Sequence, residues 1–432
     1  MIKILQEIKQ IFISDLIKIS SQTMWQVISK VATSLSSFII LGLVSRAYGQ
    51  DGTGTFTLAL TYLGFFYLAT DLGLNTYYLP RLISFKEEAN SLFNLRFILS
   101  LLLVLLAILG TFFLPFNDNN FRLLVMVGAA SIIFNGFLSS FNLIFQNQLK
   151  YESTMAAASI GAFFNVVIVA FLCLTHAALP LLAFGSLLST LITAIISFSM
   201  VSGFYQFSFK FFQANFFLST FKNAWPIMVT LGLNTVYFRI DTFILSAAYP
   251  MSVVGTYNLA YQIFQSLLVI PTFIMNSFYP ILINDQKNNL LLFNKKIVTA
   301  ALLLFSLALG GLILTWALAP FVIYLITGSD FGGSAVSLQI LSLGFPAFFL
   351  TSLLMMVMVI MGKYKELAAV YSVGLMFNLA LNWVWIPQFS FIAASWVTVV
   401  SEYLILIIQV AIVLPQLGLL TLFGKEENIN SL

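Results

Sequence analysis

Long apolar runs separated by short polar segments make up nearly all of this chain. A membrane-spanning helix needs about 20 mostly apolar residues, and runs of that length recur from residue 24 onward. The pattern therefore predicts an all-α polytopic membrane protein with about twelve transmembrane helices. The predicted spans are residues 24–46, 54–80, 95–115, 121–146, 153–175, 179–201, 225–248, 254–283, 297–327, 336–361, 364–386 and 391–414.

The spacing of the runs divides the chain into two six-helix bundles, 24–201 and 225–414. The longest connection, 202–224, joins them, and its many aromatic residues predict that it lies along the membrane interface. Residues 1–23 carry charges that interrupt any signal-peptide core, and their apolar residues recur at helical spacing. They predict an amphipathic helix on the cytoplasmic membrane face. The last segment, 415–432, is expected to be a cytoplasmic tail.

Composition excludes a water-soluble protein. Of 432 residues, 60% are hydrophobic and 8% are charged, and the mean hydropathy is +1.00. The single cysteine, Cys173, excludes an internal disulfide, and the single histidine, His176, excludes a multi-histidine metal site. No nucleotide-binding glycine loop, metal-ligand cluster or nucleophile constellation stands out. We therefore expect no enzymatic activity, no metal and no cofactor beyond a coupling proton or sodium ion.

The basic residues fix an expected orientation. With twelve spans, fifteen Lys and Arg residues fall on one side of the membrane and two fall on the other. Because cytoplasmic loops carry the excess of Lys and Arg, both termini are predicted to be cytoplasmic. This asymmetry also accounts for the net charge of +4 without a nucleic-acid partner.

An internal repeat relates the two halves. Residues 45–81 resemble residues 246–282 at a fixed offset of 201. The matches include Ser45 with Ser246, Tyr48 with Tyr249, Gly54-Thr55 with Gly255-Thr256, Asn75 with Asn276, and Tyr78 with Tyr279. Many transporters are built from such repeats, with the substrate site at the interface between them. An even number of spans per repeat predicts an axis along the membrane normal.

Ionisable residues inside the spans are the candidate functional residues. Each costs about 2.5–3.5 kcal/mol on insertion scales, so such residues usually face a cavity or a partner. They are Lys30 in the first span, Asp71 in the second, Arg239 and Asp241 in the seventh, and Glu402 in the twelfth, with Arg46 at the outer end of the first.

The expected partners differ among these residues. Lys30 and Asp71 lie at similar depth, so they can form a pair that either serves coupling or only neutralises itself. Arg239 and Asp241 are two positions apart, about 200° around a helix, and cannot share a face. Glu402 lies alone near mid-depth, where it can take up a proton or merely accept hydrogen bonds.

None of these charges is duplicated in the other half. At offset 201, Lys30 falls on Leu231, Asp71 on Thr272, Arg239 on Phe38 and Asp241 on Ile40. A scaffold requirement would be expected in both copies, whereas an asymmetric, anionic ligand needs charges in one. Lys30, Arg46 and Arg239 are the candidate phosphate-binding cations, because Arg and Lys are the usual partners of phosphate.

Two motif regions resemble a known family. Residues 41–82 read LGLVSRAYGQDGTGTFTLALTYLGFFYLATDLGLNTYYLPRL, and residues 239–267 read RIDTFILSAAYPMSVVGTYNLAYQIFQSL. With twelve spans and a repeat, they resemble the polysaccharide-transporter branch of the multidrug/oligosaccharidyl-lipid/polysaccharide exporter superfamily, and most closely O-antigen flippases of the Wzx type. The matched motif positions are Arg46 with the glycine turn 52–56, Asp71 in Asp-Leu-Gly-Leu, and Asp241 before 254–260.

The resemblance implies a MATE-like, V-shaped pair of six-helix bundles around a cationic cavity. It implies a flippase that moves an undecaprenyl-diphosphate-linked oligosaccharide, of O-antigen or capsule type, across the bacterial cytoplasmic membrane by alternating access. Lys30, Arg46 and Arg239 would bind the substrate. Asp71, Asp241 and Glu402 would couple transport to an ion or hold the cations in place. Membrane lipids and other polysaccharide-assembly membrane proteins are the implied partners.

Three other classes of function remain to be weighed. A multidrug or cation antiporter of the same superfamily is the main alternative, and the balance of three acids and three bases disfavours it only mildly. A membrane-bound polymerase or ligase would need a large external loop, which the short connections do not provide. A purely structural protein would leave the repeat and the buried charges unexplained.

Overall fold

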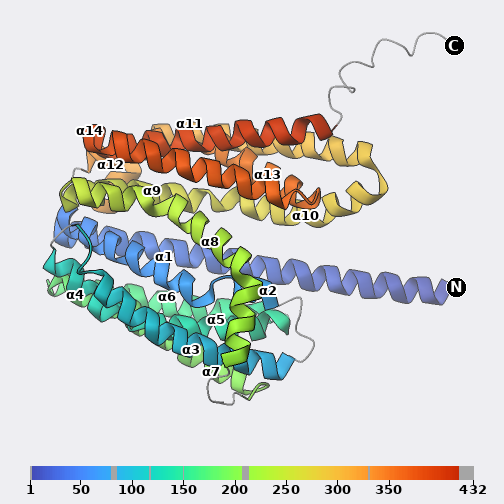
Figure 1. The fold of residues 1–432 in the computed structure, drawn as a ribbon, viewed down its shortest axis with the longest axis horizontal. Helices are drawn as coiled ribbons and strands as arrows, with labels where there is room; N and C mark the ends of the chain where they lie inside the picture. The colour runs from blue at the N-terminus through green and yellow to red at the C-terminus, as the bar shows by residue number, and fades with distance from the viewer. Residues whose placement is uncertain are drawn as a thin grey trace, which may run out of the picture. The chain divides into compact units, whose positions relative to one another are not determined.

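The computed structural model describes residues 2–78, 85–115, 118–148, 150–206, 214–328 and 331–417, and these contain helices and turns but no strand (Figure 1). Within these described ranges, eight helices are long and apolar enough to cross a membrane, or up to ten when each of two bent pairs is one span. The predicted all-α polytopic fold is therefore confirmed. The predicted C-terminal tail beyond residue 417 lies outside the described residues.

The helices follow one another with short connections. The first eight α-helices and the first short 3-10 helix are α1 (Ile2–Asp71), α2 (Leu74–Tyr78), α3 (Phe85–Gly110), α4 (Asn119–Gly128), α5 (Ser131–Asn147), α6 (Tyr151–Leu174), η2 (Leu179–Leu182), α7 (Ala183–Ser202) and α8 (Ala214–Ala248). The remainder are α9 (Met251–Leu267), α10 (Val269–Asn288), α11 (Leu290–Thr327), α12 (Gly332–Ser342), α13 (Phe345–Ile360), α14 (Tyr364–Val413) and η3 (Leu414–Gln416).

Two of these helices are each two helices joined at a sharp break. In α1 the break is at Gly49, with φ of 65°, and in α14 it is at Ser390, with φ of 57°. Because a left-handed residue cannot continue a right-handed helix, the chain leaves its helical path at both positions. When each broken helix is counted as two spans and each bent pair as one, the helices are compatible with the predicted twelve.

The structure repeats itself in the same register as the sequence. Every buried residue of α11 between 293 and 308 falls, at an offset of 201, on a buried residue of α3. The fourth span of each half is bent, by 40° between α4 and α5 and by 45° between α12 and α13. At an offset of 201, α11 ends sixteen residues beyond the position equivalent to Gly110, and the connection that follows is four residues shorter than that after α3. The net difference of twelve gives the offset of 213 between Asn119 and Gly332.

A proline shapes α11 and requires a compensating partner. Pro320 lies inside this helix and has no N–H to donate to the Trp316 carbonyl one turn earlier. The Gln339 side chain of α12 donates to that carbonyl at 2.9 Å instead. Membrane helices tolerate proline when a neighbouring group satisfies the freed carbonyl in this way.

The chain forms two compact units, one from Met1 to Gly232 and the other from Leu233 to Leu432. Helix α8 contributes to both. Its first half belongs to the first unit, where Ala224 and Met228 pack against Leu74 and Leu92. Residues 214–224 of the predicted connector are therefore helical, and Phe216, Phe217 and Phe221 also pack against this cluster.

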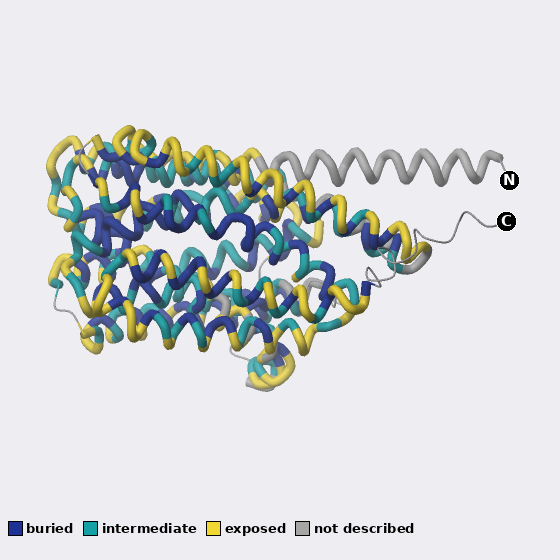
Figure 2. Tube along the Cα trace, turned by 90° about the horizontal axis from the view of Figure 1, so that it is seen from above, coloured by how far each residue is buried: buried dark blue, intermediate teal, exposed yellow. Residues whose placement is uncertain are grey.

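Residues 2–23, predicted as a separate amphipathic helix, are helical and continuous with the rest of α1. Within the spans that follow, exposed residues recur along the helices, as the yellow segments in Figure 2 show, and many of them are large apolar residues. Ile313 of α11 is 65% exposed and Phe163 of α6 is 63% exposed. Such a surface is stable only in contact with lipid.

Candidate functional site

The second span of the first unit ends abruptly at Asp71. Leu72 and Gly73 follow with φ of 45° and 72°, and the chain then forms the short helix α2. A Cβ at residue 73 would approach Ile227 of α8 to 2.6 Å, so glycine is required both for its conformation and for space. The Asp-Leu-Gly-Leu motif therefore places a carboxylate at a break in a membrane helix.

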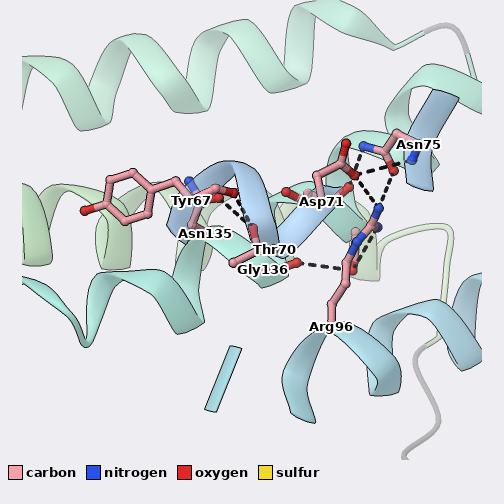
Figure 3. Close-up of polar contacts among 9 residues, drawn as sticks. Tyr67, Thr70, Asp71, Asn75, Arg96, Asn135 and Gly136 are labelled. Atoms are coloured by element: carbon pink, nitrogen blue, oxygen red, sulfur yellow. Dashed lines mark hydrogen bonds and ion pairs between the residues drawn. The ribbon is translucent and has the colours of Figure 1, made fainter. Parts of the chain in front are cut away.

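Arg96 of α3 binds this carboxylate (Figure 3). Its Nη2 lies 2.5 Å from Asp71 Oδ1 and 2.8 Å from Asn75 Oδ1, and its Nη1 lies 3.4 Å from Ser140 Oγ. Arg96 is fully buried, whereas the Asp71 side chain is 28% exposed. Asn75 also donates to the Ser139 carbonyl at 3.1 Å. The network thereby joins α1, α2, α3 and α5.

The predicted pairing of Asp71 with Lys30 is wrong. Arg96 occupies that role, and Lys30 is exposed on α1. The predicted third span begins at residue 95, which places Arg96 at its cytoplasmic end, whereas α3 begins at Phe85. The signal that identifies Arg96 is its register: it lies on the same helical stripe as the buried Leu92 and Leu103.

Asp241 of α8 lies in a buried polar cluster of the second unit. Its exposed fraction is 3%, and it accepts hydrogen bonds from the Tyr257 hydroxyl and, at 2.7 Å, from the Thr242 N–H. The Thr242 hydroxyl donates in turn to Asn258 Oδ1 at 2.9 Å. Among the described residues, no cation lies within ion-pair distance of this carboxylate.

Arg239, one half-turn earlier on α8, is half-buried and has different partners. Its Nη2 donates to Gln265 Oε1 at 2.6 Å, and its guanidinium carbon lies 5.1 Å from the centre of the Tyr261 ring. In the described part of the chain it forms no ion pair. Arg239 and Asp241 have different partners, but both reach α9, whose Tyr257, Tyr261 and Gln265 form one helical stripe.

Glu402 of α14 is the third buried carboxylate, with 3% of its surface exposed. The hydroxyl groups of Thr351 and Tyr237 lie 2.5 Å and 3.0 Å from its two oxygens. Within the described ranges, no cation pairs with it. Each carboxylate oxygen therefore has one hydroxyl partner, and α8, α13 and α14 meet at this group.

Arg96 and Arg239 differ in how their charge is balanced. Arg96 is paired with a carboxylate, which makes it a structural brace. Arg239 is held by an amide and an aromatic ring, neither of which cancels its charge. Arg46, near the end of the first helix, is exposed. Groups of three or more His, Cys, Asp or Glu that could hold a metal do not occur among the described residues.

Solved transporters share this fold over nearly the whole chain. The lipid II flippase MurJ, in an inward closed conformation, is 13% identical with a TM-score of 0.73, covering 94% of this chain and 93% of that chain. An inward-facing multidrug resistance MATE family transporter of the MOP superfamily is 16% identical with a TM-score of 0.74, covering 90% and 95%. A MATE structure in complex with MaD3S is 15% identical with a TM-score of 0.62, covering 94% and 96%. These similarities concern the fold.

The fold, with charged residues held inside apolar spans, defines a multi-pass membrane protein. No curated protein matches the sequence. The chain belongs to the polysaccharide biosynthesis protein family, whose model matches residues 19–284, more than half of its length. The resemblance to the polysaccharide-transporter branch of the exporter superfamily is thereby confirmed.

Proposed function

We propose that this protein is a flippase for a lipid-linked oligosaccharide of the O-antigen or capsule type, carried on undecaprenyl diphosphate. It would move the head group from the cytoplasmic to the outer leaflet of the bacterial inner membrane by alternating access, with both termini cytoplasmic. Membership of a polysaccharide biosynthesis family supports this proposal, as does the shared fold of a lipid II flippase. Other polysaccharide-assembly membrane proteins are proposed partners.

The observation that carries the proposal is the charge of Arg239. A half-buried guanidinium inside a span, with no acidic partner among the described residues, is costly unless a ligand compensates it. A diphosphate supplies that compensation, because phosphate oxygens accept paired hydrogen bonds from a planar guanidinium. The exposed Lys30 and Arg46 are proposed as further contacts to the diphosphate or to acidic sugars.

A multidrug or cation antiporter is the second candidate. The buried Asp241 and Glu402, neither of them paired with a cation in the described residues, favour it, because they can accept a cation or a proton. In a flippase the same two residues are proposed to couple transport to a proton or sodium gradient. Asp71, by contrast, is proposed to act through Arg96 and to keep the second span in place.

The decisive experiment compares export in cells that carry Arg239→Ala and Arg122→Ala. Arg122 is a matched control, because it is also half-buried and lies 5.3 Å from the centre of an aromatic ring, that of Phe112. Lipid-linked oligosaccharide is quantified in a deletion strain complemented with each variant, and its leaflet is located by access to an added glycan-modifying enzyme.

Arg239→Ala is expected to leave the finished unit in the inner leaflet and to remove surface polysaccharide, whereas Arg122→Ala exports normally. Equal insertion of both variants is checked by immunoblotting of membranes. Normal surface polysaccharide with Arg239→Ala would remove this residue from the substrate site. Unchanged glycan in the deletion strain, with altered sensitivity to cationic drugs, would establish the antiporter instead.

A further inference from the structure

Two residues of α9 hold Arg239, and we propose that Gln265 and Tyr261 are positioning residues that orient its guanidinium toward a phosphate-bearing ligand without neutralising it. The inference rests on the proposed function and adds what the binding site must provide, an arginine whose positive charge the protein does not neutralise. The amide of Gln265 is a specificity determinant, because a carboxylate in its place would satisfy Arg239 internally.

The contacts hold one corner of the guanidinium and place its carbon over an aromatic ring. Gln265 Oε1 accepts one N–H bond from Nη2 at 2.6 Å, and the guanidinium carbon lies over the Tyr261 ring, 5.1 Å from its centre. An arginine has five N–H donors, so most remain for a ligand. An amide and an aromatic face both attract a cation while leaving its net charge in place.

Tyr261 is itself held rigidly. Its side chain is 2% exposed, and its ring centre lies 5.6 Å from that of Tyr257 and 5.9 Å from that of Phe264. A ring packed on two sides cannot follow the guanidinium if it moves. Arg239 is therefore oriented before any ligand arrives, which lowers the entropy lost on binding.

The other buried arginine shows what the alternative looks like. Arg96 Nη2 lies 2.5 Å from a carboxylate oxygen of Asp71, a spacing close to that between Arg239 and Gln265. The geometry is similar, but the charge balance is opposite. The chain uses a carboxylate where the arginine braces helices, and an amide at the site where we place the ligand.

The test measures binding of farnesyl diphosphate, a short isoprenoid diphosphate, to the purified full-length protein in detergent, with farnesol as the uncharged comparison. Gln265→Glu is expected to weaken diphosphate binding by about tenfold to a hundredfold, because an internal ion pair replaces the charge-assisted bonds to the ligand. Its thermal stability is expected to match or exceed that of the wild type. Tyr261→Leu is expected to weaken binding by about threefold to fivefold.

Gln388→Glu is the matched control. Gln388 is an exposed residue of the same unit, and its amide bonds only to the Val384 carbonyl of its own helix at 3.1 Å. The same charge change there is expected to leave the dissociation constant unchanged. Gln265→Leu, which removes the bond without adding charge, is expected to fall between wild type and Gln265→Glu.

The outcomes separate the two proposals. If the wild type binds farnesyl diphosphate and Gln265→Glu binds it equally well, the positioning role is refuted while the flippase proposal stands. If the wild type binds neither compound, or binds farnesol as tightly as the diphosphate, the phosphate site itself is refuted. A loss of binding that merely follows a loss of thermal stability would also overturn the positioning role.

Discussion

The buried pair of Asp71 and Arg96 allows a prediction in which the two partners are not equivalent. Removing one member of a buried ion pair typically destabilises a protein by about 3–5 kcal/mol, because the other charge is left uncompensated. Arg96 is fully buried, whereas Asp71 is 28% exposed and can still be hydrated. Asp71→Asn is therefore expected to cost about 3–5 kcal/mol, and Arg96→Met less, about 1–3 kcal/mol.

The assay is reversible unfolding of the purified protein in detergent, followed by tryptophan fluorescence, for both single variants and the double variant. The double variant removes both charges, so it is expected to be more stable than Asp71→Asn alone. Lys30→Met serves as the control, since Lys30 was the sequence-based alternative partner, and it is expected to leave stability unchanged.

Three results would refute this reasoning. If Asp71→Asn is as stable as the wild type but cannot export, Asp71 acts in coupling rather than as a brace. If Lys30→Met destabilises the protein as much as Asp71→Asn does, the pairing partner is Lys30 after all. Additive effects in the double variant would show that Arg96 and Asp71 do not interact energetically.

Three further predictions concern other positions. Gly73→Ala is expected to cost about 1–3 kcal/mol in the same unfolding assay, because alanine is strained at φ of 72° and its Cβ would overlap a side chain of α8. Glu402→Gln keeps both hydroxyl partners and is expected to remain stable but to export at less than about a tenth of the wild-type rate if the residue carries the coupling ion; normal export would make it structural. Gln339→Leu is expected to lower the free energy of unfolding by about 1–2 kcal/mol, because it leaves the Trp316 carbonyl without its donor. Adding Pro320→Ala to this variant should recover the lost stability, because residue 320 then has an N–H to donate to that carbonyl.

The fold could be read from the sequence because its rules are local. Span length follows from bilayer thickness, and the repeat is visible because Gly, Tyr and Asn recur at one offset. The bend in the fourth span of the first half was not foreseen, since neither a charged residue nor a proline separates α4 from α5 in the sequence.

The site was only partly predictable, because its contacts lie between helices. Arg239 and Asp241 were found from their depth, but nothing local indicates that Tyr261 and Gln265 of the next helix hold Arg239. Arg96 was misplaced because counting charges in loops treats a residue near a span end as cytoplasmic. Following the helical spacing of apolar residues upstream of residue 95 would have placed Arg96 inside the helix.

The pair at Asp71 also constrains how this sequence can vary. At the offset of the repeat, the second half carries Thr272 and Ile297 in place of Asp71 and Arg96, so both charges are missing together. A variant that holds only one of the two charges is an unstable intermediate, and selection removes such variants. Among related chains, residues 71 and 96 should therefore be inherited as a unit, either both charged or both neutral.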